Sequence, residues 1–265
     1  MNFLEGKGAR VRWQLWGDEL SDESPCFALI NGYTRSSQDF RRMATAFVRE
    51  GFRVLSLDNR GCGETWTEKE FSLKDMAEDW LRLWDHLGIQ WVHLAGISMG
   101  GLIARVLLSQ APEKIRTLTL ISTVPEPSFL EGSGQEGWPE DPAAVMDRLR
   151  HYVAAEFYRS NKVLIQAMAQ NMVRDMREHQ FGERAAMQRR AILAFDVRNF
   201  PLPDVLPAVQ VIQGKEDQIV SPEAFHELIR IFQAEGLMLE GAGHLLLAEK
   251  STLLQQALLT FCRRG

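Results

Sequence analysis

The chain has 265 residues, of which 45% are hydrophobic, and a formal net charge of −5. This is enough apolar sequence for one large core or for one domain with an insertion. The sequence has no basic stripe between aromatic residues, so we expect no nucleic-acid partner. No apolar run is long enough to span a membrane, so we expect no membrane insertion. The start is not signal-like and the three cysteines are scattered, so we expect a cytoplasmic location.

Strands and helices are predicted to alternate over the first half of the chain. Strand patterns occur at residues 11–16, 26–30, 52–57, 92–95 and 115–121. A helix is predicted from Ser36 or Ser37 to about Glu50, and a second one opens at the capping box between Ser72 and Asp75. Such alternation is typical of a mostly parallel sheet with helices on both faces.

The alternation stops after residue 123, and no strand-like run occurs between residues 124 and 206. Helical patterns are found there instead, at residues 145–158, 163–177 and 183–195. The sheet resumes at 209–212, followed by a helix over 222–232, a strand at 237–239 and a closing helix over about 251–263. We therefore expect a core domain formed by residues 1–123 and 207–265, and a helical cap formed by residues 124–206.

The stretch from residue 91 to residue 108 contains the motif G-x-S-x-G at residues 96–100, between a predicted strand and a predicted helix. A strand that turns into a helix within one residue forces the corner residue into strained backbone geometry. Side chains two positions before and after the corner would collide, so both positions favour glycine. Ser98 is therefore predicted to stand exposed at the carboxyl edge of the sheet, beside the N-terminus of a helix.

Four further motifs follow other predicted strands: NGY at 31–33, DNRGCG at 58–63, GKED at 214–217 and GAGH at 241–244. Together with the serine motif, and in this order, they make the chain resemble the α/β-hydrolase fold family over nearly its whole length. The resemblance implies a mostly parallel sheet of eight strands, and its nearest subgroup is that of small capped esterases and lactonases. Asn31 stands where many relatives have histidine, and a serine at position 98 argues against branches that use a carboxylate nucleophile.

A serine nucleophile needs a base within hydrogen-bond reach, and the base needs a carboxylate that fixes its tautomer. Of the six histidines, only His244 lies in a small-residue turn just after a strand at the carboxyl edge. Asp217 is the favoured carboxylate because it follows the strand at 209–212, while Glu216 and Glu126 are its rivals. Ser98, Asp217 and His244 are thus the predicted catalytic residues.

By resemblance, the backbone N–H groups of Tyr33 and Met99 form the oxyanion hole. No metal-binding or nucleotide-binding spacing is found, so we expect neither a metal nor a cofactor. The predicted activity is serine-dependent hydrolysis of a small or medium carboxylic ester or lactone. The alternatives are a carbon–carbon bond hydrolase or a cofactor-free perhydrolase with the same triad, and a ligand-binding protein on a hydrolase scaffold.

Overall fold

The computed structural model describes residues 2–67, 69–130, 138–178 and 181–265. Their strands are β1 (Asn2–Gly6), β2 (Ala9–Trp16), β3 (Cys26–Ile30), β4 (Arg53–Leu57), β5 (Trp66–Thr67), β6 (Val92–Ile97), β7 (Ile115–Ile121), β8 (Ala208–Gly214) and β9 (Glu235–Leu239). Eight of them form one path in the order β1-β2-β4-β3-β6-β7-β8-β9, and the short β5 pairs with β2 beside it. From β4 to β9 every pairing on the path is parallel, which confirms the predicted fold class.

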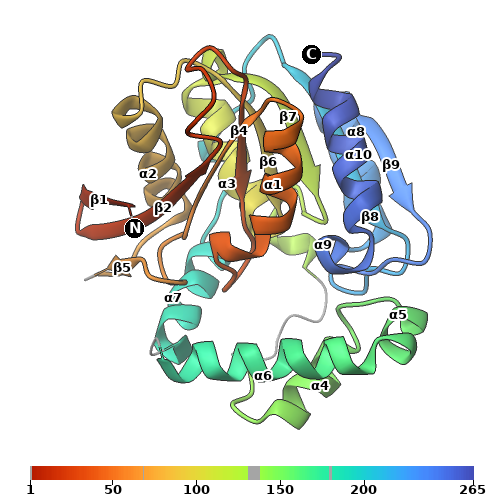
Figure 1. The fold of residues 1–265 in the computed structure, drawn as a ribbon. Helices are drawn as coiled ribbons and strands as arrows, with labels where there is room; N and C mark the ends of the chain where they lie inside the picture. The colour runs from red at the N-terminus through yellow and green to blue at the C-terminus, as the bar shows by residue number, and fades with distance from the viewer. Residues whose placement is uncertain (1, 68, 131–137, 179–180) are drawn as a thin grey trace.

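Helices cover both faces of this sheet (Figure 1). The longer ones around the sheet are α1 (Arg41–Arg49), α2 (Leu73–His86), α3 (Met99–Gln110), α8 (Pro222–Phe232) and α10 (Ser251–Cys262). Strand β3 shows how side chains divide between the faces: Ala28 and Ile30 pack in the core under α2, α3 and α8, whereas Phe27 and Leu29 pack under α1 and α10. This alternation is the period of two expected of a strand that is buried on both sides.

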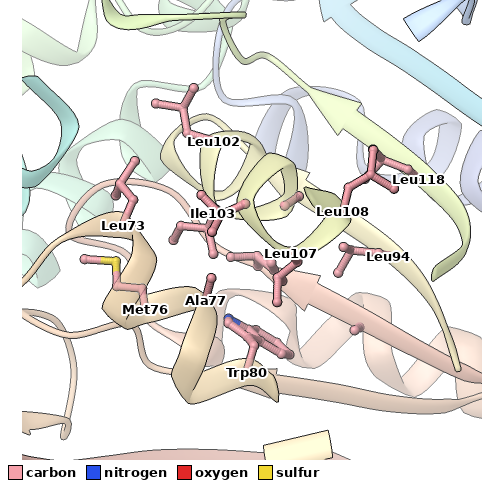
Figure 2. Packing of buried hydrophobic residues seen from close by; sticks show 14 of the residues in the cluster. Leu73, Met76, Ala77, Trp80, Leu94, Leu102, Ile103, Leu107, Leu108 and Leu118 are labelled. Carbon is pink, nitrogen blue, oxygen red and sulfur yellow. The ribbon is translucent and has the colours of Figure 1, made fainter. Parts of the chain in front are cut away.

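The core between α2, α3 and the sheet holds the serine-bearing turn in place. Ser72 caps α2 in the predicted capping box, since its hydroxyl accepts from Asp75 N while the Asp75 carboxylate accepts from Ser72 N. Figure 2 shows the apolar side chains of α2 and α3 packed together: Leu73, Met76, Ala77, Trp80, Leu102, Ile103 and Leu107. Because α3 begins at Met99, this packing fixes the helix that directly follows Ser98.

Among the described residues, four α-helices lie between β7 and β8 and gather beyond one end of the strands (Figure 1). They are α4 (Pro142–Leu149), α5 (Ala155–Ser160), α6 (Lys162–Glu178) and α7 (Phe181–Leu193), and we call them the α4–α7 segment. An apolar cluster of its own lies inside it, around Val145, Leu149 and Ile165. None of the described helices is both long and apolar enough to cross a membrane.

One predicted helix of this segment, at residues 145–158, is wrong as a single element. The structure divides it into α4 and α5, with a break at residues 150–154. Within the break, the carbonyl of Tyr152 accepts the backbone N–H groups of His244 and Leu245, at 2.8 and 3.2 Å. These bonds come from a loop that is distant in sequence, so the helical pattern of residues 145–158 could not reveal them.

Candidate active site

Ser98 occupies the corner between β6 and α3, with φ +53° and ψ −119°. A non-glycine residue with positive φ is strained and persists only where its surroundings enforce it. The glycines on either side are needed for space. A Cβ atom at Gly96 would lie 2.3 Å from Gly100 O, and one at Gly100 would lie 2.3 Å from Ile30 O. The G-x-S-x-G motif is therefore required by close backbone packing.

Two hydrogen bonds to the Ser98 backbone hold the corner at the end of the sheet. Ser98 N donates to Ile121 O at 2.9 Å, and the hydroxyl of Thr123 donates to Ser98 O at 2.6 Å. On the other side, the loop at residues 31–33 approaches closely, because a Cβ atom at Gly32 would lie 3.2 Å from Ser98 Cβ. The side-chain oxygen of Ser98 thus stands on a fixed backbone between two strand-end loops.

The structure brings Ser98, His244 and Asp217 together in one hydrogen-bonded chain. Ser98 Oγ lies 3.2 Å from His244 Nε2, and His244 Nδ1 lies 2.9 Å from Asp217 Oδ2. An ionised carboxylate can only accept, so the Nδ1 proton donates to Asp217 and the lone pair of Nε2 faces the serine in the neutral ring. The side chains of His244 and Asp217 are 6% and 0% exposed, which shields the contact between them from water.

Asp217 is held in turn by the loop that carries it. Its Oδ1 accepts the backbone N–H groups of Ile219 at 2.8 Å and Val220 at 3.0 Å. The two rival carboxylates point elsewhere: Glu216 is exposed and accepts from Ala155 N at 3.3 Å, and Glu126 accepts from the hydroxyl of Ser128 at 2.8 Å. The contact to His244 is therefore made by Asp217.

The two predicted oxyanion donors belong to residues close to the serine, one next in the chain and one in the adjacent loop. Met99 follows Ser98 directly, and Tyr33 follows Gly32 in the adjacent loop. Among the described residues, neither backbone N–H has a hydrogen-bond acceptor. Asn31 stabilises that loop, since its side chain donates to Ser36 O at 2.7 Å and accepts from Gly32 N at 2.9 Å. Asparagine at this position thus fixes the loop through its own bonds.

Comparison with known proteins identifies the fold family. The model of the alpha/beta hydrolase fold family matches residues 25–251. The chain belongs to this family. Of its relatives, the dihydrolipoyllysine-residue acetyltransferase component of the acetoin cleaving system of Pseudomonas putida is 29% identical, over 97% of this chain and 68% of that protein. A bifunctional esterase/perhydrolase of Acinetobacter calcoaceticus is 25% identical, over 83% of each protein.

Solved structures show the same fold. An alpha/beta hydrolase enzyme from a Medee basin deep-sea metagenome library superposes with a TM-score of 0.86 at 19% identity, over 100% of this chain and 98% of that one. Among the described residues of this α/β-hydrolase, no group of three or more His, Cys, Asp or Glu side chains is placed to hold a metal ion.

Sequence reasoning missed two side chains that connect this α/β-hydrolase core to the α4–α7 segment. Gln188 of α7 is fully buried; its Oε1 accepts from Thr34 N at 2.7 Å and its Nε2 donates to Arg60 O at 2.8 Å. Glu249, at the end of α9 (Leu246–Glu249), accepts from Ala154 N at 2.7 Å. Gln188 occupies an ordinary position in a helical pattern and Glu249 lies just before the predicted closing helix, so no local signal distinguishes either residue.

One aromatic side chain of the α4–α7 segment lies beside the histidine. The ring of Tyr152 meets His244 edge-on, with centroids 5.8 Å apart, and the ring of Trp138, which precedes α4, lies with its centroid 5.1 Å from that of Tyr152. Burial raises the pKa of the Tyr152 hydroxyl, and burial likewise raises the pKa of Tyr33. Both phenols are therefore neutral at physiological pH and offer O–H groups next to an apolar surface.

Proposed function

We propose that this α/β-hydrolase is a serine hydrolase that cleaves a small or medium carboxylic ester or lactone through an acyl-enzyme. The observation that carries the proposal is the chain of two contacts, 3.2 Å from Ser98 Oγ to His244 Nε2 and 2.9 Å from His244 Nδ1 to Asp217 Oδ2. A serine, a base and a carboxylate that orients the base are the parts that nucleophilic acyl transfer requires.

In the first half of the reaction, Ser98 Oγ attacks the substrate carbonyl while His244 Nε2 takes the hydroxyl proton. Asp217 stabilises the imidazolium that forms. The carbonyl oxygen becomes an oxyanion, for which the N–H groups of Met99 and Tyr33 are available as donors. Each such donor is worth about 3–4 kcal/mol in the transition state. The histidine then returns its proton to the leaving alcohol oxygen, and the acyl group stays on Ser98.

In the second half, His244 takes a proton from a water molecule, and the hydroxide formed attacks the acyl carbonyl. Collapse of the intermediate releases the acid, and the proton returns to Ser98. We further propose that the α4–α7 segment acts as a cap over this reaction. Tyr152 of that segment stands next to His244 and contacts Trp138, which precedes α4, and these two rings would give the bound substrate an apolar wall.

The test is hydrolysis of a graded series of p-nitrophenyl esters, from acetate to long acyl chains, by the wild type and by Ser98→Ala. We expect turnover that Ser98→Ala abolishes, and an optimum of acyl length that reports the size of the pocket. Full activity in Ser98→Ala would refute the proposal. Failure of a fluorophosphonate to label the wild type would favour the ligand-binding alternative instead.

Perhydrolysis is a second candidate because the relative from Acinetobacter calcoaceticus is a bifunctional esterase/perhydrolase. In that reaction hydrogen peroxide replaces water as the nucleophile that attacks the acyl-enzyme, and a peracid is released. Adding hydrogen peroxide to the ester assay and measuring the peracid distinguishes the two outcomes. A peracid yield that Ser98→Ala abolishes would establish this second activity on the same serine.

A further inference from the structure

The proposed mechanism leaves one carboxylate beside the histidine without a role. Glu249 Oε2 accepts from Gly243 N at 2.9 Å, and its Oε1 accepts from Leu245 N at 3.1 Å. These two N–H groups belong to the residues immediately before and after His244. The same Oε2 also accepts from Ala154 N, at 2.7 Å, in the break between α4 and α5. One half-buried carboxylate thus binds both sides of the histidine loop and the α4–α7 segment.

Helix capping does not explain this arrangement. Glu249 is the last residue of α9, which has four residues, and only Leu245 belongs to the start of that helix. Gly243 lies before the helix and Ala154 is 95 residues away in the chain. Burial raises the pKa of Glu249 while the three backbone N–H groups oppose that rise, so the carboxylate is a partly desolvated group whose charge is met by peptide donors.

The neighbouring backbone leaves little freedom for other positions of the loop. The carbonyl of Tyr152 accepts from both His244 N and Leu245 N. At Gly243 a Cβ atom would lie 2.8 Å from the carbonyl carbon of Val153. The histidine loop and residues 152–154 are therefore in direct backbone contact, and Glu249 closes this contact from the side of α9.

We propose that Glu249 is a positioning residue for His244: it fixes the loop on both sides of the histidine and fastens it to the α4–α7 segment. The inference rests on the proposed function, in which His244 is the base. A displacement of about 1 Å between reacting groups can lower a rate about 100-fold. Glu249 thus helps to maintain the distance of 3.2 Å between Ser98 Oγ and His244 Nε2.

The decisive variant is Glu249→Gln, which has nearly the same shape. Its one carbonyl oxygen can replace Oε2, but its amide nitrogen then faces the N–H of Leu245, so a donor meets a donor. The matched control is Glu216→Gln. The Glu216 side chain also accepts an N–H of the α4–α7 segment, from Ala155 at 3.3 Å, but it makes no bond to the histidine loop, and the backbone bond from Glu216 N to Ala242 O is retained in this variant.

Two measurements test the proposal. The first is kcat and KM for p-nitrophenyl acetate, with kcat expressed per site labelled by a fluorophosphonate. The second is the downfield proton NMR signal of His244 Nδ1–H, identified by its absence in His244→Gln. For Glu249→Gln we expect kcat to fall about 10-fold with little change in KM, and the NMR signal to shift or broaden. Glu216→Gln should match the wild type in both.

Turnover per labelled site within twofold of wild type, together with an unchanged NMR signal, would overturn the proposal even if Glu249→Gln melted at a lower temperature. If the wild type neither turns over esters nor reacts with the fluorophosphonate, the proposed function fails, and the NMR signal alone still decides the role of Glu249. Should Glu249→Gln not fold, Ala154→Pro carries the test. The backbone φ of Ala154, −58°, suits proline, and the substitution removes the N–H that donates to Glu249. A smaller fall in kcat and a smaller change in the NMR signal are therefore expected.

Discussion

Replacing Asp217 by asparagine separates the two tasks of this carboxylate. Oδ1 accepts the N–H groups of Ile219 and Val220, and Oδ2 accepts from His244 Nδ1. Asparagine has one oxygen only. Two fixed backbone N–H groups, those of Ile219 and Val220, compete for this oxygen against the single N–H of His244. The oxygen should therefore stay with the two backbone groups, and the amide nitrogen should turn toward His244. Nδ1 must then accept, which places the ring proton on Nε2, facing Ser98.

The expected loss follows from this tautomer. A histidine with its proton on Nε2 cannot take the serine proton, and the imidazolium loses its carboxylate partner. In a serine protease the equivalent change lowers kcat about 10⁴-fold, which corresponds to about 5.5 kcal/mol of transition-state stabilisation. Both backbone bonds are retained, so the free energy of unfolding should change by less than about 1 kcal/mol. Asp217→Asn should therefore be a folded but nearly inactive protein.

The assay is turnover of p-nitrophenyl esters together with urea unfolding of the same samples. Ser98→Ala gives the background rate, and Glu216→Gln and Glu126→Gln serve as controls that should keep wild-type kcat. If Asp217→Asn retained more than about a tenth of the wild-type kcat, the assignment of this carboxylate and the tautomer argument would both fail.

Three other predictions concern residues that support the fold or the loops of the site. Gly100→Ala should lower the free energy of unfolding by about 3 kcal/mol because the new Cβ atom would collide with backbone atoms. At Gly182 a Cβ atom would meet nothing within 4 Å, so Gly182→Ala should be neutral or stabilise α7 by up to about 1 kcal/mol. Urea unfolding that ranks the two variants the other way would contradict the packing argument. Gln188→Leu removes both the acceptor of Thr34 N and the donor to Arg60 O and should lower kcat/KM about 10-fold; an unchanged kcat/KM would mean that these two bonds are unimportant for the site. Burial lowers the pKa of His93 from its usual 6.5 to about 4, so as the pH falls the unfolded state binds a proton before the folded state does. The free energy of unfolding should therefore fall between pH 6.5 and pH 4, by at most about 3 kcal/mol. Urea unfolding of His93→Gln at several pH values should lack this slope.

Local signals predicted the part of the molecule that depends on neighbours in sequence. The capping box at Ser72 and the helix over residues 222–232 require only short-range patterns, and both are present in the structure. The glycines around Ser98 could be interpreted because backbone crowding at a strand-to-helix corner is a general constraint. The order of the motifs then placed Asp217 and His244 at the same edge of the sheet as Ser98.

What could not be predicted depends on partners far along the chain. Gln188 binds Thr34 across 154 positions, and Glu249 binds Ala154 across 95. The break between α4 and α5 has the same cause, since Tyr152 uses its carbonyl for the histidine loop rather than for a helix. Strand β5 has two residues, too few for a periodic pattern to be recognised. Such features follow from tertiary contacts, for which a single sequence carries no periodic signal.

The bonds between the α4–α7 segment and the core limit how the substrate specificity of this hydrolase can be changed by exchanging that segment. Exchanging the whole segment for that of another hydrolase would take away Tyr152 and Gln188, and with them bonds to the loops on both sides of Ser98. A transplant that keeps residues 150–155 and Gln188, and replaces only the helices between them, would preserve those loops. The outer surface of α6, where Val163 is 82% exposed, is a region where new sequence can be introduced without touching them.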